Sequence, residues 1–378
     1  MLKIMTPGPT QVSERVRMAR SLECTNPDLD PAFFDFYKET CECISSLLNT
    51  RNETLILDGE GILGLEACCA SLTEREDPVL VIDNGVYGKG FADFVKMYGG
   101  VPKLYTTDYL NPVDPDKLDA FLSQNHNFKY ATLVHCDTPS GMLNDVATLC
   151  PILKKYGILT VVDSVSGMFG NELSVDDCQI DLLCGGSQKA LSAPPGLTFV
   201  VMSEAAKKSI HARKTPIASF YANLAVFDGY YESKWFPYTM PISDIYGLRA
   251  ALDEIKEDPD RIPRHHRIAS AVRTALTDAG ISLHLESGFS DTVTVFDIPE
   301  GITADDILTT MKEDCGILLA GSFDSLSGKV IRIGHMGTNA NIADVEAVLK
   351  GLDYTFAKLG ISLQVSLLEA FQTHIKTK

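Results

Sequence analysis

Short apolar runs recur through the first 200 residues, and each is followed by a turn and a stretch with helical spacing. The runs are continuous rather than alternating, which is typical of strands that helices cover on both faces of a sheet. The predicted strands are Thr54–Asp58, Pro78–Asp83, Val101–Thr106, Tyr130–Cys136, Gly157–Asp163, Asp181–Gly185 and Leu197–Met202. Because strands alternate with helices, the pattern predicts an α/β fold around a mainly parallel seven-stranded sheet flanked by helices.

The helical stretch at 144–156 illustrates the spacing. Its apolar stripe consists of Val146, Leu149, Ile152 and Leu153. Asn144 stands directly before this stripe, so we expect its side chain to cap the first turn of the helix.

The pattern changes after about residue 255. The charged stretch 253–267 reads as a linker, and we expect His265 and His266 within it to be solvated. The elements predicted beyond it are strands at Thr292–Phe296 and Lys329–Ile333 and helices at Ala304–Met311 and Ala343–Leu359. We therefore predict a large domain at residues 1–255 and a smaller C-terminal α+β domain at residues 256–378.

Composition and charge narrow the classes of function. The chain carries 33 Lys and Arg against 50 Asp and Glu, a formal charge of −17, which disfavours nucleic-acid and anionic-membrane partners. No apolar run approaches the ~18 residues of a membrane-spanning helix, and no signal-peptide core follows the N-terminus. The ten cysteines lack regular spacing and predict free thiols, so we expect a cytoplasmic enzyme.

The first chemical signal is a glycine loop. Gly59, Gly61 and Gly64 form G-x-G-x-x-G after a predicted strand and open a helix, and Asp83 ends the next strand. This context is that of a dinucleotide-binding site, but the spacing shows only that backbone N–H groups can receive an anion. A glycine-rich turn without a ligand, a nicotinamide cofactor and another phosphate-bearing cofactor all remain open on this motif.

A second pair of residues separates these alternatives. Asp163 ends a buried strand in VVDSVSG, and Lys189 lies in the small-residue loop GGSQKALSAPPG after another strand. Carboxyl ends of strands are where α/β sheets build their sites. A lysine for a Schiff base and an acid for a pyridinium nitrogen are what pyridoxal phosphate requires, and its phosphate would occupy the glycine loop. A dinucleotide would leave Asp163 and Lys189 without a role.

Several segments in order along the chain carry a family resemblance. They are TPGPT (Thr6–Thr10), DGEGILGLEA (Asp58–Ala67), DNGVYGKG (Asp83–Gly90), HCDTPSGMLND (His135–Asp145), VVDSVSG, GGSQKALSAPPG and GKVIRIGHMG (Gly328–Gly337). Together they resemble the class V, fold-type I aminotransferases, most closely the alanine:glyoxylate and serine:pyruvate branch. The resemblance implies pyridoxal 5′-phosphate as cofactor, a small amino acid and a 2-oxo acid as substrates, and a homodimer with shared active sites.

The resemblance also implies roles for single residues. Lys189 would hold the cofactor as a Schiff base and move the proton, and Asp163 would accept the pyridinium N–H. The cofactor contacts it implies are Gly59, Glu60, Gly61, Ile62, Tyr87, Thr138, Asp163, Gln188 and Lys189, with Thr239 reaching the phosphate of the neighbouring subunit. The substrate contacts it implies are Gly8 and Arg332, whose planar guanidinium would clamp a carboxylate. The alternating pattern of GKVIRIG predicts that Arg332 faces the cofactor.

Three departures from the family pattern concern the site. Glu60 stands in the phosphate loop where relatives carry a small hydroxyl residue, and a carboxylate there would repel phosphate, so we expect it to point away, be protonated or pair with a cation. Phe236 replaces a tyrosine from the partner subunit, which removes one hydroxyl contact to the phosphate. Segment 21–33 lacks a histidine common in relatives.

Other functions remain as alternatives to the amino-acid aminotransferase. A 2-aminoethylphosphonate:pyruvate aminotransferase is one, because His135–Asn144 resembles its pattern. A cysteine desulfurase or lyase of the same fold is disfavoured, because Gln188 rather than histidine precedes the lysine and Cys315 is the one candidate thiol. A nicotinamide oxidoreductase would use the glycine loop and Asp83. No spacing typical of a metal site is found.

Overall fold

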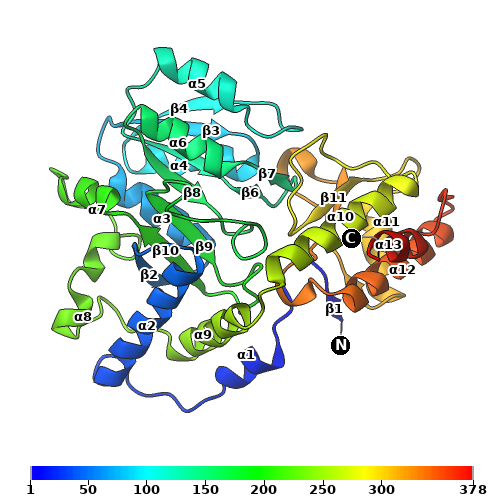
Figure 1. The fold of residues 1–378 in the computed structure, drawn as a ribbon, viewed down its shortest axis with the longest axis horizontal. Coiled ribbons are helices and arrows are strands. Elements are labelled where there is room, and N and C mark those ends of the chain that lie inside the picture. Colours follow the sequence, from blue (N-terminus) through cyan, green and yellow to red (C-terminus); the bar gives the residue numbers. More distant parts are fainter. Residues whose placement is uncertain (1, 377–378) are drawn as a thin grey trace.

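Figure 1 shows the computed structural model of the protein, which describes residues 2–376. A seven-stranded sheet has the order β2-β10-β9-β8-β5-β3-β4. The strands are β2 (Glu53–Asp58), β3 (Pro78–Asp83), β4 (Val101–Thr106), β5 (Tyr130–Val134), β8 (Leu159–Asp163), β9 (Leu182–Gly186) and β10 (Leu197–Met202). Neighbouring strands are parallel except that β10 runs antiparallel to β2 and β9, so the predicted mainly parallel sheet is confirmed.

Helices pack around this sheet. They are α1 (Glu14–Ala19), α2 (Pro31–Leu47), α3 (Gly61–Leu72), α4 (Val86–Met97), α5 (Pro115–Gln124), α6 (Val146–Lys155), α7 (Glu204–His211), α8 (Tyr230–Ser233) and α9 (Ile242–Lys256), with a 3₁₀ turn η1 (Leu224–Phe227). Helix α3 packs against β9 and β10 and also against α4, while α6 packs against β8. A short antiparallel pair, β6 (Cys136–Asp137) and β7 (Met142–Leu143), lies near the carboxyl end of β5.

The C-terminal part forms a second cluster of elements, drawn from yellow to red in Figure 1. Its helices are α10 (Arg261–Asp278), α11 (Ala304–Glu313), α12 (Ile342–Lys358) and α13 (Leu367–His374), with 3₁₀ turns η2 (Asp324–Leu326) and η3 (Gly337–Asn339). Strands β11 (Thr294–Asp297) and β13 (Val330–Ile333) pair antiparallel, and β12 (Ile317–Leu318) pairs parallel with the N-terminal β1 (Lys3–Ile4).

The buried apolar side chains form one core in each of these two parts, and a small third cluster joins them, made of Cys136, Ala190, Val293, Val295, Val330 and Met336. The larger core spans Val16 to Ile255, and the smaller joins Met5 to side chains between Ile268 and Phe371. The N-terminal strand thus packs with the C-terminal elements. The division into domains at residues 1–255 and 256–378 stays a prediction. Strand β1 lies in the first of these ranges but pairs with β12 of the second.

The burial of the strands follows their place in the sheet. Every residue of β5, β9 and β10 is buried, as the continuous apolar runs predict. Strand β4 is different, because it lies at the edge of the sheet and every residue of it is exposed or half-buried. The predicted strand Tyr130–Cys136 is also shorter than expected, since β5 ends at Val134 and Cys136 starts β6.

Two local predictions are wrong, and each error has a tertiary cause. The cap of α6 is Asp145 rather than Asn144, because the Asn144 amide bonds the Val113 N–H and the Val134 carbonyl, at 2.9 and 2.8 Å. His265 is buried rather than solvated: α10 includes it, and its ring nitrogens bond the Arg261 carbonyl and the Gly337 N–H. Only His266 is exposed as expected.

Within residues 2–376 no helix has both the length and the apolar character needed to cross a membrane. The same residues contain no group of three or more His, Cys, Asp or Glu side chains placed to hold a metal ion.

Candidate active site

A pocket lies where the sheet presents the carboxyl ends of its central strands. Asp163 is the last residue of β8, and Lys189 lies in the loop after β9. The start of α3 and the first turn of α4 complete the wall. The lining residues are Glu60, Gly61, Ile62, Leu65, Tyr87, Cys136, Thr138, Asp163, Val165, Ser166 and Lys189. Both residues predicted to be catalytic therefore line one pocket, as α/β sheets favour.

The environment of Lys189 lowers the pKa of its amine. Burial lowers the pKa of Lys189, and the nearby guanidinium of Arg332 lowers that pKa further. Its Nζ donates to the carbonyl of Pro7 at 2.9 Å, and the Thr10 hydroxyl holds the Lys189 carbonyl at 3.0 Å. A lowered pKa increases the neutral fraction of an amine, which is its nucleophilic form.

Gly8 lies directly against Lys189. Its φ is +108°, and a Cβ there would come within 2.5 Å of the Lys189 Cδ. Only glycine fits this approach without moving the lysine. The structure therefore brings Gly8, predicted to contact substrate, to the reactive amine.

Asp163 is a buried carboxyl. Burial raises the pKa of Asp163 to about 7, with the charge of Asp137 adding to this and Lys189 opposing it. Its Oδ1 accepts the Val165 N–H at 2.9 Å. A cationic N–H donor in the pocket would favour the ionised carboxylate and offset the cost of burial.

Tyr87 is positioned by an acid that the sequence reasoning missed. Asp137 is buried, and its Oδ1 accepts the backbone N–H of Tyr87 at 3.1 Å while the Ser140 hydroxyl donates to Oδ2 at 2.7 Å. Burial raises the pKa of Tyr87 to about 12, so its hydroxyl stays protonated. The Tyr87 ring meets Phe323 edge-on, with centroids 6.1 Å apart. The signal for Asp137 was its place directly before Thr138 in the segment HCDTPSG.

Arg332 reaches the pocket from the C-terminal cluster. Its Nε donates to the Gly321 carbonyl at 2.6 Å and its Nη1 to the Thr138 carbonyl at 3.3 Å. Among the described residues, no hydrogen-bond acceptor is found for its Nη2. The neighbours Ile331 and Ile333 turn into the smaller core, so the predicted alternation of faces is confirmed.

The start of α3 already carries an anionic group. Glu60 is its N-cap, and its Oε2 accepts the Ile62 N–H at 3.0 Å. Its Oε1 accepts a short hydrogen bond from the Gln188 amide. The carboxylate is therefore not directed away, and no cation pairs with it among residues 2–376: it occupies the position where the helix offers its free N–H groups. A Cβ on Gly61 would approach Val165 to 3.0 Å, which keeps this turn tight.

Some predicted residues lie outside the pocket. Thr239 is exposed, and its hydroxyl donates to Asp28 at 3.0 Å. Gly59 precedes the lining residues of the loop, and Phe236 packs in an aromatic cluster, stacked on Phe34 at 4.3 Å between centroids. The Asp83 carboxylate accepts hydrogen bonds from the Thr106 and Tyr109 hydroxyls. It is therefore not free to bind a dinucleotide.

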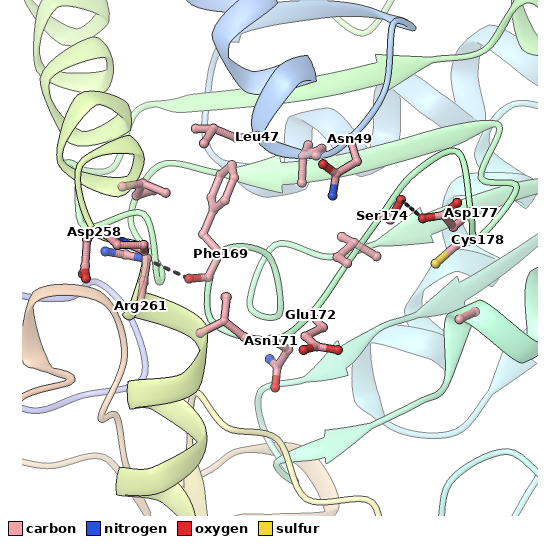
Figure 2. Close-up of a pocket in the computed structure, with 16 residues that line it drawn as sticks. Leu47, Asn49, Phe169, Asn171, Glu172, Ser174, Asp177, Cys178, Asp258 and Arg261 are labelled. Atoms are coloured by element: carbon pink, nitrogen blue, oxygen red, sulfur yellow. Dashed lines mark hydrogen bonds between the residues drawn. The ribbon is translucent and has the colours of Figure 1, made fainter.

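A larger cavity, of about 530 Å³, lies elsewhere in the molecule. Figure 2 shows it between the end of α2, the loop that follows β8 and the start of α10. Its polar groups bond one another: Arg261 donates to the Phe169 carbonyl at 2.9 Å, and Ser174 to Asp177 at 2.7 Å. None of the predicted site residues lines it.

Comparison with known proteins agrees with the geometry. The family model Aminotransferase class-V matches residues 32–348. The chain is 32% identical to a pyridoxamine–pyruvate transaminase of Mesorhizobium japonicum, over 89% of this chain and 87% of that protein. It is also 32% identical to an alanine–glyoxylate aminotransferase of Callithrix jacchus, over 92% and 86%. The crystal structure of ureidoglycine–glyoxylate aminotransferase from Bacillus subtilis superposes with a TM-score of 0.95 at 29% identity, covering 100% of this chain and 98% of that one.

The chain belongs to the class V aminotransferases. Members of this family depend on pyridoxal phosphate, so the predicted enzyme class, cofactor and fold type are confirmed at the level of the family. The family assignment replaces the nicotinamide oxidoreductase that the glycine loop and Asp83 had left open.

The pocket of this aminotransferase has two ends, and they fit the cofactor differently. The ring end, formed by Lys189, Asp163 and Tyr87, offers an amine, an acid and an aromatic face, and the buried Ser166 hydroxyl there has no partner among the described residues. The loop end, formed by Glu60, Ile62 and Gln188, does not fit a phosphate, because a carboxylate occupies it.

Proposed function

We propose that this aminotransferase moves an amino group between a small α-amino acid, of the alanine or serine type, and glyoxylate or pyruvate. The observation that carries the proposal is that Lys189 and Asp163 line one pocket while Arg332 bonds the carbonyl of Thr138 in its wall. The names of the relatives support the acceptor, since each of those compared above acts with glyoxylate or pyruvate.

We assign one task to each of these side chains. The bound pyridoxal ring supplies an electron sink for the charge that develops at the substrate Cα. Lys189 would hold the ring through Nζ and, once its amine is free again, would move the proton at the substrate Cα. Asp163 would accept the ring N–H and keep it protonated. Arg332 binds the α-carboxylate, for which its Nη2 is available.

Steady-state rates with alanine, serine and 2-aminoethylphosphonate as donors, each with glyoxylate and with pyruvate, test this proposal. We expect the highest kcat/KM with an α-amino acid, because the phosphonate offers no carboxylate to Arg332. A higher kcat/KM for the phosphonate would replace the donor. Lys189→Ala is the control for adventitious activity, and turnover that survives in this variant would overturn the assignment of the lysine.

The thiol chemistry of a desulfurase finds no support in Cys315. This thiol is half-buried beside the Gly351 carbonyl, at 3.8 Å, and burial raises its pKa. A nucleophilic cysteine needs the opposite shift.

We propose that the active unit is a homodimer in the cytoplasm. Thr239 lies outside its own pocket, and exposed apolar side chains gather on the neighbouring segments, among them Leu22, Leu29, Phe220 and Trp235. Free cysteines are typical of a reducing compartment, and all ten are unpaired here. A mixture of Lys189→Ala and Thr239→Ala proteins is expected to regain activity through hybrid dimers. Sedimentation of an active monomer would contradict the dimer.

A further inference from the structure

The loop end of the pocket is an anion site that the chain fills with its own anion. Free N–H groups at the start of a helix attract negative charge. In α3 the Ile62 N–H is bonded to the Glu60 carboxylate, and the Leu63 N–H is bonded to the Glu60 carbonyl at 2.8 Å. A phosphate would have to displace this carboxylate or lie against it, and two anions in contact repel each other.

The side-chain polar atoms around Glu60 also do not suit a phosphate, which needs hydrogen-bond donors. Gln188 is buried, with 3% of its surface exposed, and its Oε1 has no hydrogen-bond partner among the described residues. Its Nε2 is already used by Glu60. Among the lining residues Lys189 carries the one cationic side chain, and it is engaged at the other end of the pocket. The loop end therefore presents an acceptor, the Glu60 carboxylate, to its ligand, and the amide donor of the buried Gln188 is already engaged.

A hydrogen-bond acceptor in a pocket favours a ligand that carries a hydrogen-bond donor. A hydroxymethyl group is neutral, is smaller than a phosphate ester and carries one O–H donor. A site built to bond a hydroxyl discriminates through the polar groups that any other ligand leaves unpaired. The repulsion by Glu60 adds discrimination against the phosphorylated form.

We propose that this pocket takes the phosphate-free forms of its cofactor, pyridoxal and pyridoxamine, and that pyridoxamine serves as an amino donor to the 2-oxo acid. The proposal rests on the proposed function, since it uses the same lysine and the same acceptor. In the net reaction, the C4′–N bond of pyridoxamine breaks and a Cα–N bond forms. C4′ is oxidised to the aldehyde of pyridoxal while the ketone carbon is reduced to the amino acid, so no further oxidant is needed.

Titration of the protein with pyridoxal and with pyridoxal phosphate, followed by the yellow absorbance of the Schiff base, tests the preference. We expect wild type to bind pyridoxal about 10- to 100-fold more tightly than pyridoxal phosphate, the scale of one charged hydrogen bond. Glu60→Ser is expected to reverse the order, and serine still caps α3. Glu60→Gln is the matched control: it keeps the size and an acceptor but removes the charge, so it should gain affinity for the phosphate and keep pyridoxal.

The rate of pyridoxal formation from pyridoxamine with pyruvate or glyoxylate tests the activity. Turnover in wild type that falls in Glu60→Ser supports the proposal. Tighter binding of pyridoxal phosphate by wild type, or no pyridoxal formed, overturns it while the proposed amino-acid reaction still stands. Absence of Schiff-base absorbance with either compound points instead to failure of the Lys189 assignment, and with it of the proposed function.

Discussion

The ring end and the loop end of the pocket differ in how strictly their residues are constrained. At the ring end, Asp163 is buried and Lys189 is half-buried, and Gly8 and Asp137 hold the neighbouring atoms in place. At the loop end, Glu60 is an exposed helix cap on a flexible side chain. Chemistry requires fixed groups at the ring, whereas recognition of the other end of the ligand can change with one side chain. We infer that a substitution at the loop end can alter which ligand binds without altering the reaction at the ring end.

Removal of the acid at the ring end should have the largest effect. Asp163→Asn keeps the shape but cannot hold the ring nitrogen protonated, so we expect kcat to fall by about 10²- to 10³-fold, the scale of one lost preorganised electrostatic contact. The fall should be the same with the phosphorylated and the phosphate-free ligand. Steady-state kinetics in both series measure it, and a loss confined to one ligand would break the distinction between the two ends.

Arg332→Gln should have an intermediate effect. Loss of a charged, bidentate contact to a carboxylate costs about 1.5–3 kcal/mol, or about 10- to 150-fold in the KM for pyruvate. The preference for pyridoxal over pyridoxal phosphate should not change, because Arg332 bonds the Gly321 and Thr138 carbonyls and not the loop end. An unchanged KM for the oxo acid together with a changed preference would contradict this assignment.

The third prediction concerns the stability of the protein without ligand. Burial raises the pKa of Asp163 to about 7, above the value near 3.9 of an unfolded chain. The folded state therefore binds more protons, and the contribution of Asp163 is present below pH ~4 and is lost as the pH rises to ~7, by at most about 1.4 kcal/mol per pH unit. As the pH rises from 5 to 8, we expect the unfolding midpoint of wild type to fall relative to that of Asp163→Asn. Parallel midpoints over this range would refute the raised pKa.

Glu60 links the two ends in this respect. Its charge adds to the raised pKa of Asp163. In Glu60→Gln the pH range of the stability loss should therefore move downward, which the same unfolding series can measure. An unmoved range would show that the two ends are electrostatically independent.

The sequence by itself determined the fold class, the family and the ring end. Continuous apolar runs predict buried strands because a strand covered on both faces has no polar side. Both ends of β3, β4 and β10 agree with the prediction, and those of β2 and β9 lie within one residue of it. Lys189 and Asp163 were found because each follows a predicted strand, and strands of a parallel sheet end at one edge.

Only the tertiary structure decided the state of residues whose partners lie far along the chain. The Asn144 amide bonds residues 31 and 10 positions away, and the buried His265 bonds Gly337 across 72 positions. Asp137 and Pro7 belong to the site for the same reason. Asp137 accepts the Tyr87 backbone N–H, and the Pro7 carbonyl accepts from Lys189 Nζ. Glu60 shows the limit most clearly: the sequence marked a carboxylate out of place, but its destination depended on the Ile62 N–H and on Gln188, 128 residues away. A local pattern specifies which face a residue takes, whereas a hydrogen-bond partner depends on which loops the fold brings together.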